Sequence, residues 1–169
     1  MDKAIVNKVA NSKLIQIDLE EFIPKGERKT IFLSDWLFEG IILKEIDFNQ
    51  KIAAHNWQQY QNAFVAIHPA EDAIVPNWAY LLLTAKLSGI AQKILIGTRQ
   101  ELENQLLLDS IEKTDFSSYK SRQIIIKGCS KTPISNNAYA LLIQQLKPLV
   151  KSMMFGEACS NIPLFKHRN

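Results

Sequence analysis

The sequence predicts an α/β protein with three layers, in which helices cover a mostly parallel sheet that an N-terminal β-hairpin extends. From Ala63 onward, short apolar strand candidates alternate with helical segments, which is the pattern of βαβ units. The strand candidates are apolar almost throughout, as expected for strands buried on both faces of a parallel sheet. An α+β sandwich in which the early strands dominate the sheet is the alternative that this pattern leaves open.

The N-terminal residues 1–62 form the predicted extension of a single domain, and residues 63–169 form its βαβ core. The extension is expected to contain two extended segments around a turn rich in Pro and Gly, which is typical of a hairpin. Its expected elements are a short helix over Lys3–Ala10, strands within Leu14–Leu19 and Thr30–Leu33 around a turn at Pro24–Gly26, and a helix from Asp47 to about His55.

The core is predicted from apolar spacing and capping residues. Thr98 and Glu101 have the spacing of a capping box, so a helix should begin there. Two further helices show apolar residues at helical spacing, Trp78, Leu81, Leu82 and Ala85 after Pro76, and Tyr139, Leu142 and Leu146 after Ser135. The expected strands are Ala63–Ile67, Lys93–Ile96, Gln123–Ile126 and Ser152–Phe155.

Composition limits the class of protein. Hydrophobic residues make up 47% of the 169 residues, charged residues make up 22%, and the net charge is only +3. These are values of an ordinary globular domain, and basic residues gather only at Lys166–Arg168, so nucleic acid is not an expected partner. The first residues lack the apolar core of a signal peptide. Apolar runs are far shorter than the roughly 20 residues that span a bilayer, so the expectation is a cytoplasmic protein without a membrane partner.

Chemistry-bearing residues follow the predicted strands. In open parallel sheets, ligands bind beyond the carboxyl ends of the strands. His68 and Asp72 follow the first core strand, Gly128–Lys131 follows the third, and Gly156–Ser160 follows the fourth. This edge of the sheet is therefore the predicted working surface.

Two of these loops share the pattern C-S-x-x-P, beginning at Cys129 and Cys159. If their strands are neighbours, both thiols lie at one edge, with Glu157 and Lys131 as further candidate catalytic residues and Ser130 and Ser160 as candidate cofactor-binding residues. In a reducing compartment the cysteines are expected to be thiols, ligands or catalytic groups. Burial as small packing residues is the alternative.

Cys129 is predicted to be the more reactive of the two thiols. Lys131 and the helix expected near Ser135 place positive charge and helix-end N–H groups close to it, and both favour a thiolate. Cys159 follows the acidic Glu157 and has no predicted helix after it.

The same edge is also a candidate metal site. Thiolates of Cys129 and Cys159 with Glu157, Asp72 and His68 could hold iron, zinc or a transient iron–sulfur cluster. The sequence has no C-x-x-C pair, so such a site depends on the fold to bring these residues together.

Four segments carry a resemblance to a bacterial family, the domain of unknown function 2480 (DUF2480): Ser34–Gly40, Asp72–Tyr80, Lys127–Ser130 and Lys151–Ser160. The chain resembles this family over essentially its whole length. The resemblance implies no assigned activity. It does imply similarity to proteins encoded near iron–sulfur assembly components of sulfur mobilisation, which makes iron–sulfur assembly proteins candidate partners.

Three functions remain open. The leading hypothesis is an accessory factor in iron–sulfur or sulfur metabolism, in which Cys129 and Cys159 hold a metal, a cluster or a persulfide. The second is a small enzyme with a cysteine nucleophile and Asp72, Glu157 or His68 as its acid or base. The third is a noncatalytic module whose strand-end loops bind another protein. No oligomeric state is predicted.

Overall fold

The computed structural model describes residues 14–157 and 159–167. The helix expected over Lys3–Ala10 lies outside the described residues. The chain divides into two compact units. Unit 1 comprises Met1–Pro24 and Leu106–Asn169, and unit 2 comprises Lys25–Gln105, so the segment that forms unit 2 interrupts the chain of unit 1.

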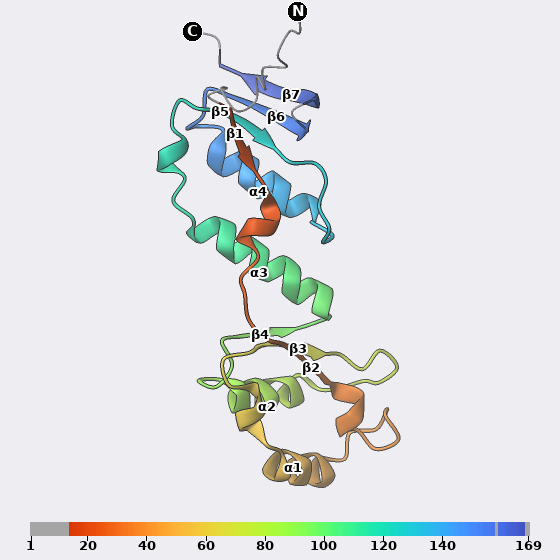
Figure 1. Ribbon diagram of the computed structural model, residues 1–169. Coiled ribbons are helices and arrows are strands. Elements are labelled where there is room, and N and C mark those ends of the chain that lie inside the picture. Colours follow the sequence, from red (N-terminus) through yellow and green to blue (C-terminus); the bar gives the residue numbers. More distant parts are fainter. Residues whose placement is uncertain (1–13, 158, 168–169) are drawn as a thin grey trace, which may run out of the picture. The chain divides into compact units, whose positions relative to one another are not determined.

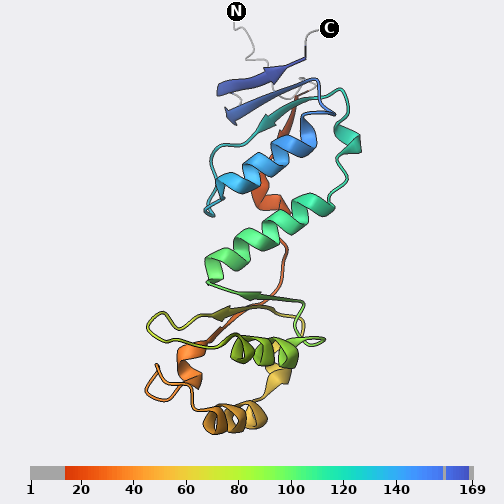
Figure 2. The same ribbon diagram turned by 180° about the vertical axis from the view of Figure 1, so that it is seen from behind.

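Unit 2 contains a parallel sheet with the strand order β2-β3-β4. Figures 1 and 2 show its helices α1 and α2 on the same side of this sheet. On the other face, Arg28 lies over the Phe64 ring and its guanidinium binds Glu103, in the first turns of α3 (Arg99–Lys113). The elements are β2 (Arg28–Phe32), η2 (Leu33–Trp36), α1 (Glu45–Ala54), η3 (Trp57–Tyr60), β3 (Phe64–His68), α2 (Asn77–Leu87) and β4 (Lys93–Ile96).

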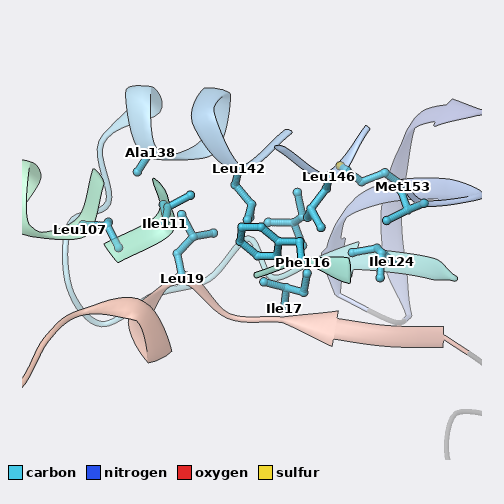
Figure 3. Close-up of a cluster of buried hydrophobic side chains, with 12 residues drawn as sticks. Ile17, Leu19, Leu107, Ile111, Phe116, Ile124, Ala138, Leu142, Leu146 and Met153 are labelled. Carbon is cyan, nitrogen blue, oxygen red and sulfur yellow. The ribbon is translucent and has the colours of Figure 1, made fainter. Parts of the chain in front are cut away.

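Unit 1 contains a sheet with the strand order β1-β5-β6-β7, in which only the pair of β6 and β7 is antiparallel. Figure 3 shows side chains of α3 and α4, including Ile111 and Leu142, meeting those of the strands in one buried cluster. Helix α3 crosses the boundary between the units. The elements are β1 (Leu14–Ile17), η1 (Leu19–Phe22), α3 (Arg99–Lys113), η4 (Ser117–Tyr119), β5 (Gln123–Ile126), α4 (Asn136–Leu146), β6 (Ser152–Glu157) and β7 (Ser160–Lys166).

The α/β class and the mostly parallel pairing are confirmed, but the strands are arranged differently from the prediction. The core strands divide between two sheets instead of forming one. The N-terminal strands β1 and β2 both form, yet they do not pair with each other, because β1 pairs in parallel with β5 and β2 with β3. β1 and β2 each lie at the edge of a sheet beside a buried apolar strand, β5 or β3. Long-range parallel pairing therefore replaces the expected hairpin. Among the described strands, β6 and β7 form the antiparallel hairpin.

The two units repeat one structural frame. Helix α2 begins at Asn77 and α4 at Asn136, a separation of 59 residues. The same separation relates the strand pair β3 and β4 to β5 and β6, and it relates α1 to the last turns of α3. Before these elements, each unit has an edge strand followed at once by a short 3-10 helix, β1–η1 or β2–η2. Residues related in this way are called counterparts below.

Hydrogen bonds and backbone angles repeat as well. Asn62 and its counterpart Ser121 have positive φ angles of 57° and 60°. The N–H of Asn62 donates to the carbonyl of Ile90 at 2.9 Å, and the N–H of Ser121 donates to the carbonyl of Leu149 at the same distance. Agreement at this level indicates that both units are built on one backbone plan.

Candidate functional site

The carboxyl ends of β1 and β5 bring two charged residues together in unit 1. Ile17 lies opposite Ile126 in the parallel register, so the next residues, Asp18 and Lys127, are neighbours at the end of the sheet. The Lys127 ammonium donates to Asp18 Oδ2 at 2.6 Å. The side chains are 31% and 18% exposed, so this ion pair is partly shielded from water and from screening by salt.

The ion pair changes the protonation of both groups. Burial raises the pKa of Asp18, but hydrogen bonds from Lys127 and from the Glu20 N–H outweigh it and hold that pKa below its usual value. The hydrogen bond to Asp18 is the largest cause that raises the pKa of Lys127, and the charges of Glu20 and Glu157 add to it. Both groups are therefore charged at neutral pH.

Glu20 fixes the loop that carries Cys129. Its Oε1 accepts hydrogen bonds from the N–H groups of Lys131 and Thr132, the second at 2.7 Å. Ser130 Oγ donates to the Thr132 carbonyl at 2.7 Å and closes the turn. The predicted site residue Lys131 is thus held by its backbone, and the two amide groups near Cys129 already have a carboxylate acceptor.

A thiol, a phenol and a carboxylate complete this edge. Burial raises the pKa of the Tyr139 hydroxyl, and negative charge at Asp18, Cys129 and Glu20 raises it further. Each of these three groups therefore lies within electrostatic range of the Tyr139 hydroxyl. Glu157 Oε1 is buried and has no hydrogen-bond partner. We call these residues the strand-end site: Asp18, Glu20, Lys127, Cys129, Tyr139 and Glu157.

The two cysteines lie in different local structures. Both are free thiols and both are exposed, which excludes their predicted alternative role as buried packing residues. Cys129 lies in the loop that leads to α4, whereas Cys159 lies in the tight turn between β6 and β7. The shared C-S-x-x-P pattern therefore precedes a helix in one case and runs into a strand in the other. The described structure records no contact between the two thiols.

The predicted metal ligands are divided between the two units. His68 and Asp72 belong to unit 2, whereas Cys129, Cys159 and Glu157 belong to unit 1. Among the residues that the structure describes, no three His, Cys, Asp or Glu side chains gather in a way that could hold a metal ion. Ser160, the second predicted cofactor-binding serine, is exposed opposite Glu157 in the hairpin.

His68 has a local role in unit 2. Its Nδ1 lies 2.9 Å from the Pro69 carbonyl, and its ring packs on Phe32 at 5.3 Å. Phe32 and His68 occupy the positions that Asp18 and Lys127 occupy in unit 1, because each pair follows the same register at the end of its sheet. One frame therefore holds a charged pair in unit 1 and an aromatic pair in unit 2.

Comparison with known proteins identifies the family. A family model described as "Protein of unknown function (DUF2480)" matches residues 3–167, nearly the whole chain. The chain belongs to the DUF2480 family. No curated protein and no solved structure matches it. In the described part of this DUF2480 chain, no helix is long and apolar enough to cross a membrane.

Unit 2 of the DUF2480 chain has a cleft that the sequence did not predict as a site. The cleft has a volume of about 420 Å³ and lies along the outer edge of β2. Trp36, His55 and Tyr60 form an aromatic wall, with the His55 ring 4.9 Å from Trp36 and 5.6 Å from Tyr60. The residues that line the cleft are Thr30, Ile31, Phe32, Asp35, Trp36, Lys51, Ala54, His55 and Tyr60.

The His55 ring is held in one orientation. Its Nε2 lies 3.0 Å from the Tyr60 hydroxyl and 3.0 Å from the amide nitrogen of Gln59. Burial lowers the pKa of His55 and raises the pKa of Tyr60, so both are neutral at pH 7. No spacing motif marks this cleft in the sequence, because its wall and its edge come from four separate elements.

Proposed function

We propose that this protein is an accessory factor of sulfur or iron–sulfur metabolism in which Cys129 of the strand-end site accepts and passes on a sulfur atom. The observation that carries the proposal is the difference between the two units. Unit 2 builds the same frame with Phe32 and His68, so folding does not require the charged pair of Asp18 and Lys127. A polar group that the frame does not require is a candidate for function.

The proposed reaction is a thiol exchange at sulfur. The Cys129 thiolate attacks the outer sulfur of a donor persulfide, R–S–SH, and a new S–S bond forms at Cys129 Sγ. The S–S bond of the donor breaks, and its electron pair leaves with R–S⁻. The product is Cys129–S–SH, which keeps the proton of the donor, so no oxidant or reductant is consumed.

The surrounding residues support this step in two ways. The Lys127 ammonium lies at the same edge and can offset the negative charge that moves from thiolate to leaving group. Glu20 holds the loop, so the thiol is presented from a fixed turn and not from a free chain end. Proteins that mobilise sulfur as cysteine persulfides are the proposed donors.

Cys159 provides a matched control for the proposal, because it is also a free and exposed thiol but lies in a hairpin turn. The full chain is treated with inorganic polysulfide, alkylated, digested and mapped by mass spectrometry. We expect one added sulfur atom at Cys129, retained in Cys159→Ser and lost in Cys129→Ser. Equal uptake at both cysteines, or faster uptake at Cys159, would show that exposure alone decides reactivity and would overturn the proposal.

A further inference from the structure

The outer edge of β2 presents unpaired backbone to the cleft of unit 2. In a parallel ladder, alternate residues direct both backbone groups toward one neighbouring strand. The Phe64 N–H donates to the Glu27 carbonyl at 2.8 Å, so Glu27, Lys29 and Ile31 face β3. The N–H and C=O groups of Thr30 and the N–H of Phe32 therefore point outward, where β2 has no neighbouring strand within the described structure. The Phe32 carbonyl accepts the first hydrogen bond of η2, because Phe32 is the N-cap of that helix.

The cleft lies beside these same residues. Thr30 and Phe32 line it together with Ile31, Trp36 and His55. The Ile31 side chain lies on the opposite face of the sheet from the side chains of Thr30 and Phe32. A hollow that reaches both faces must pass around the sheet at its edge. The cleft thus combines outward backbone groups at a spacing of two residues with an aromatic pocket for a side chain.

We propose that this cleft binds an extended peptide segment of a partner protein, which adds a strand alongside β2 and places one large apolar side chain against Trp36. Alternating N–H and C=O groups are the hydrogen-bonding pattern that an extended peptide satisfies. The volume of about 420 Å³ is within the range of sites that enclose a ligand. This inference concerns unit 2 and does not rest on the proposed sulfur chemistry of unit 1.

The counterparts in unit 1 show which residues open the cleft. Ala54 and His55 correspond to Lys113 and Thr114. The common frame therefore accepts a long side chain at this position, since Lys113 ends α3 in unit 1. At the end of α1 in unit 2, the small Ala54 leaves open the space that a lysine side chain would fill. The cleft depends on a small residue that the fold itself does not demand.

This comparison supplies the test variants. Ala54→Lys places a long side chain in the cleft at an exposed helix end, where a cation is favourable. Ala53→Lys is the matched control, because Ala53 is also exposed but does not line the cleft. The probe is a displayed library of short peptides, selected on the full wild-type chain.

Selected peptides should share a large apolar residue within an extended, proline-poor segment. Ala54→Lys should weaken their binding about tenfold or more, equivalent to about 1.4 kcal/mol, and Ala53→Lys should leave it unchanged. The backbone amide signals of Thr30 and Phe32 in nitrogen-15 NMR spectra should shift on binding.

Three outcomes would overturn the inference. The first is a selection that enriches no peptide. The second is peptide binding that Ala54→Lys does not weaken, or that shifts the amide signals of residues away from Thr30 and Phe32. The third is a concentration-dependent dimer that Ala54→Lys disperses in sedimentation experiments, because the occupant would then be a second copy of the chain.

Discussion

Replacing matched core leucines by alanine should destabilise the two units by the same amount. Leu83 in α2 and its counterpart Leu142 in α4 are both 0% exposed and belong to separate buried clusters. Removing roughly three carbon groups at about 0.8 kcal/mol each forfeits about 2.4 kcal/mol of transfer free energy. A residual cavity of about 50 Å³ adds about 1.2 kcal/mol. Each substitution should therefore lower the free energy of unfolding by about 3.5 kcal/mol.

Urea unfolding followed by far-ultraviolet circular dichroism measures both losses. Trp36, Trp57 and Trp78 all lie in unit 2, so tryptophan fluorescence reports specifically on the unit that Leu83→Ala perturbs. Leu81→Ala, at a position that is 61% exposed in the same helix, is the control and should cost less than about 1 kcal/mol. A loss below about 1 kcal/mol at either leucine, or a twofold difference between them, would refute the common frame.

Other substitutions probe the turn after β6 and the charged groups. Gly156→Ala should destabilise the chain more than Gly40→Ala, because both glycines have positive φ but only at Gly156 would a Cβ lie 2.5 Å from a backbone oxygen. Thermal unfolding compares the two variants, and equal losses of stability would contradict the steric argument. The pKa of Asp18 is depressed in the folded state, so the stability that its carboxylate contributes is present above the ordinary aspartate pKa of about 3.9 and is lost as pH falls through the folded pKa. The difference in stability between wild type and Asp18→Asn should therefore shrink on acidification. A difference that stays constant with pH would argue against a stabilising ion pair. The depressed pKa of His55 means that protonation favours the unfolded state. Below about pH 6.5 the wild type should therefore lose more stability than His55→Gln does. Identical profiles of stability against pH for the two proteins would contradict this.

Local signals predicted the individual elements well. The capping box is present, since the Glu101 N–H donates to Thr98 Oγ1 and the Thr98 N–H donates to Glu101 Oε2. Leu142 and Leu146 are buried at their predicted positions. For α2 the predicted apolar face was wrong, because Leu83 and Leu87 are buried while Trp78 and Leu81 are 39% and 61% exposed. This helix is apolar almost all round, so periodicity could not choose its buried face.

Pairing between distant segments could not be predicted in the same way. Asp18 and Lys127 are 109 residues apart in sequence, and neither forms part of a local motif, so the central ion pair of the strand-end site was missed. The repeat was the signal available in the sequence, because Asn77–Leu83 and Asn136–Leu142 share the pattern N-x-A-Y-x-L-L. It would have predicted two like units and shown Lys127 to be the counterpart of His68.

Sulfur uptake at Cys129 in a chain with Asp18→Phe and Lys127→His tests the central claim most directly. This double substitution gives unit 1 the aromatic pair that unit 2 carries at the same positions, so the frame should still fold with an unchanged circular dichroism spectrum. The rate of persulfide formation at Cys129 should fall about tenfold or more, a loss of about 1.4 kcal/mol in activation free energy. An unchanged rate would contradict the claim that the charged pair serves the thiol.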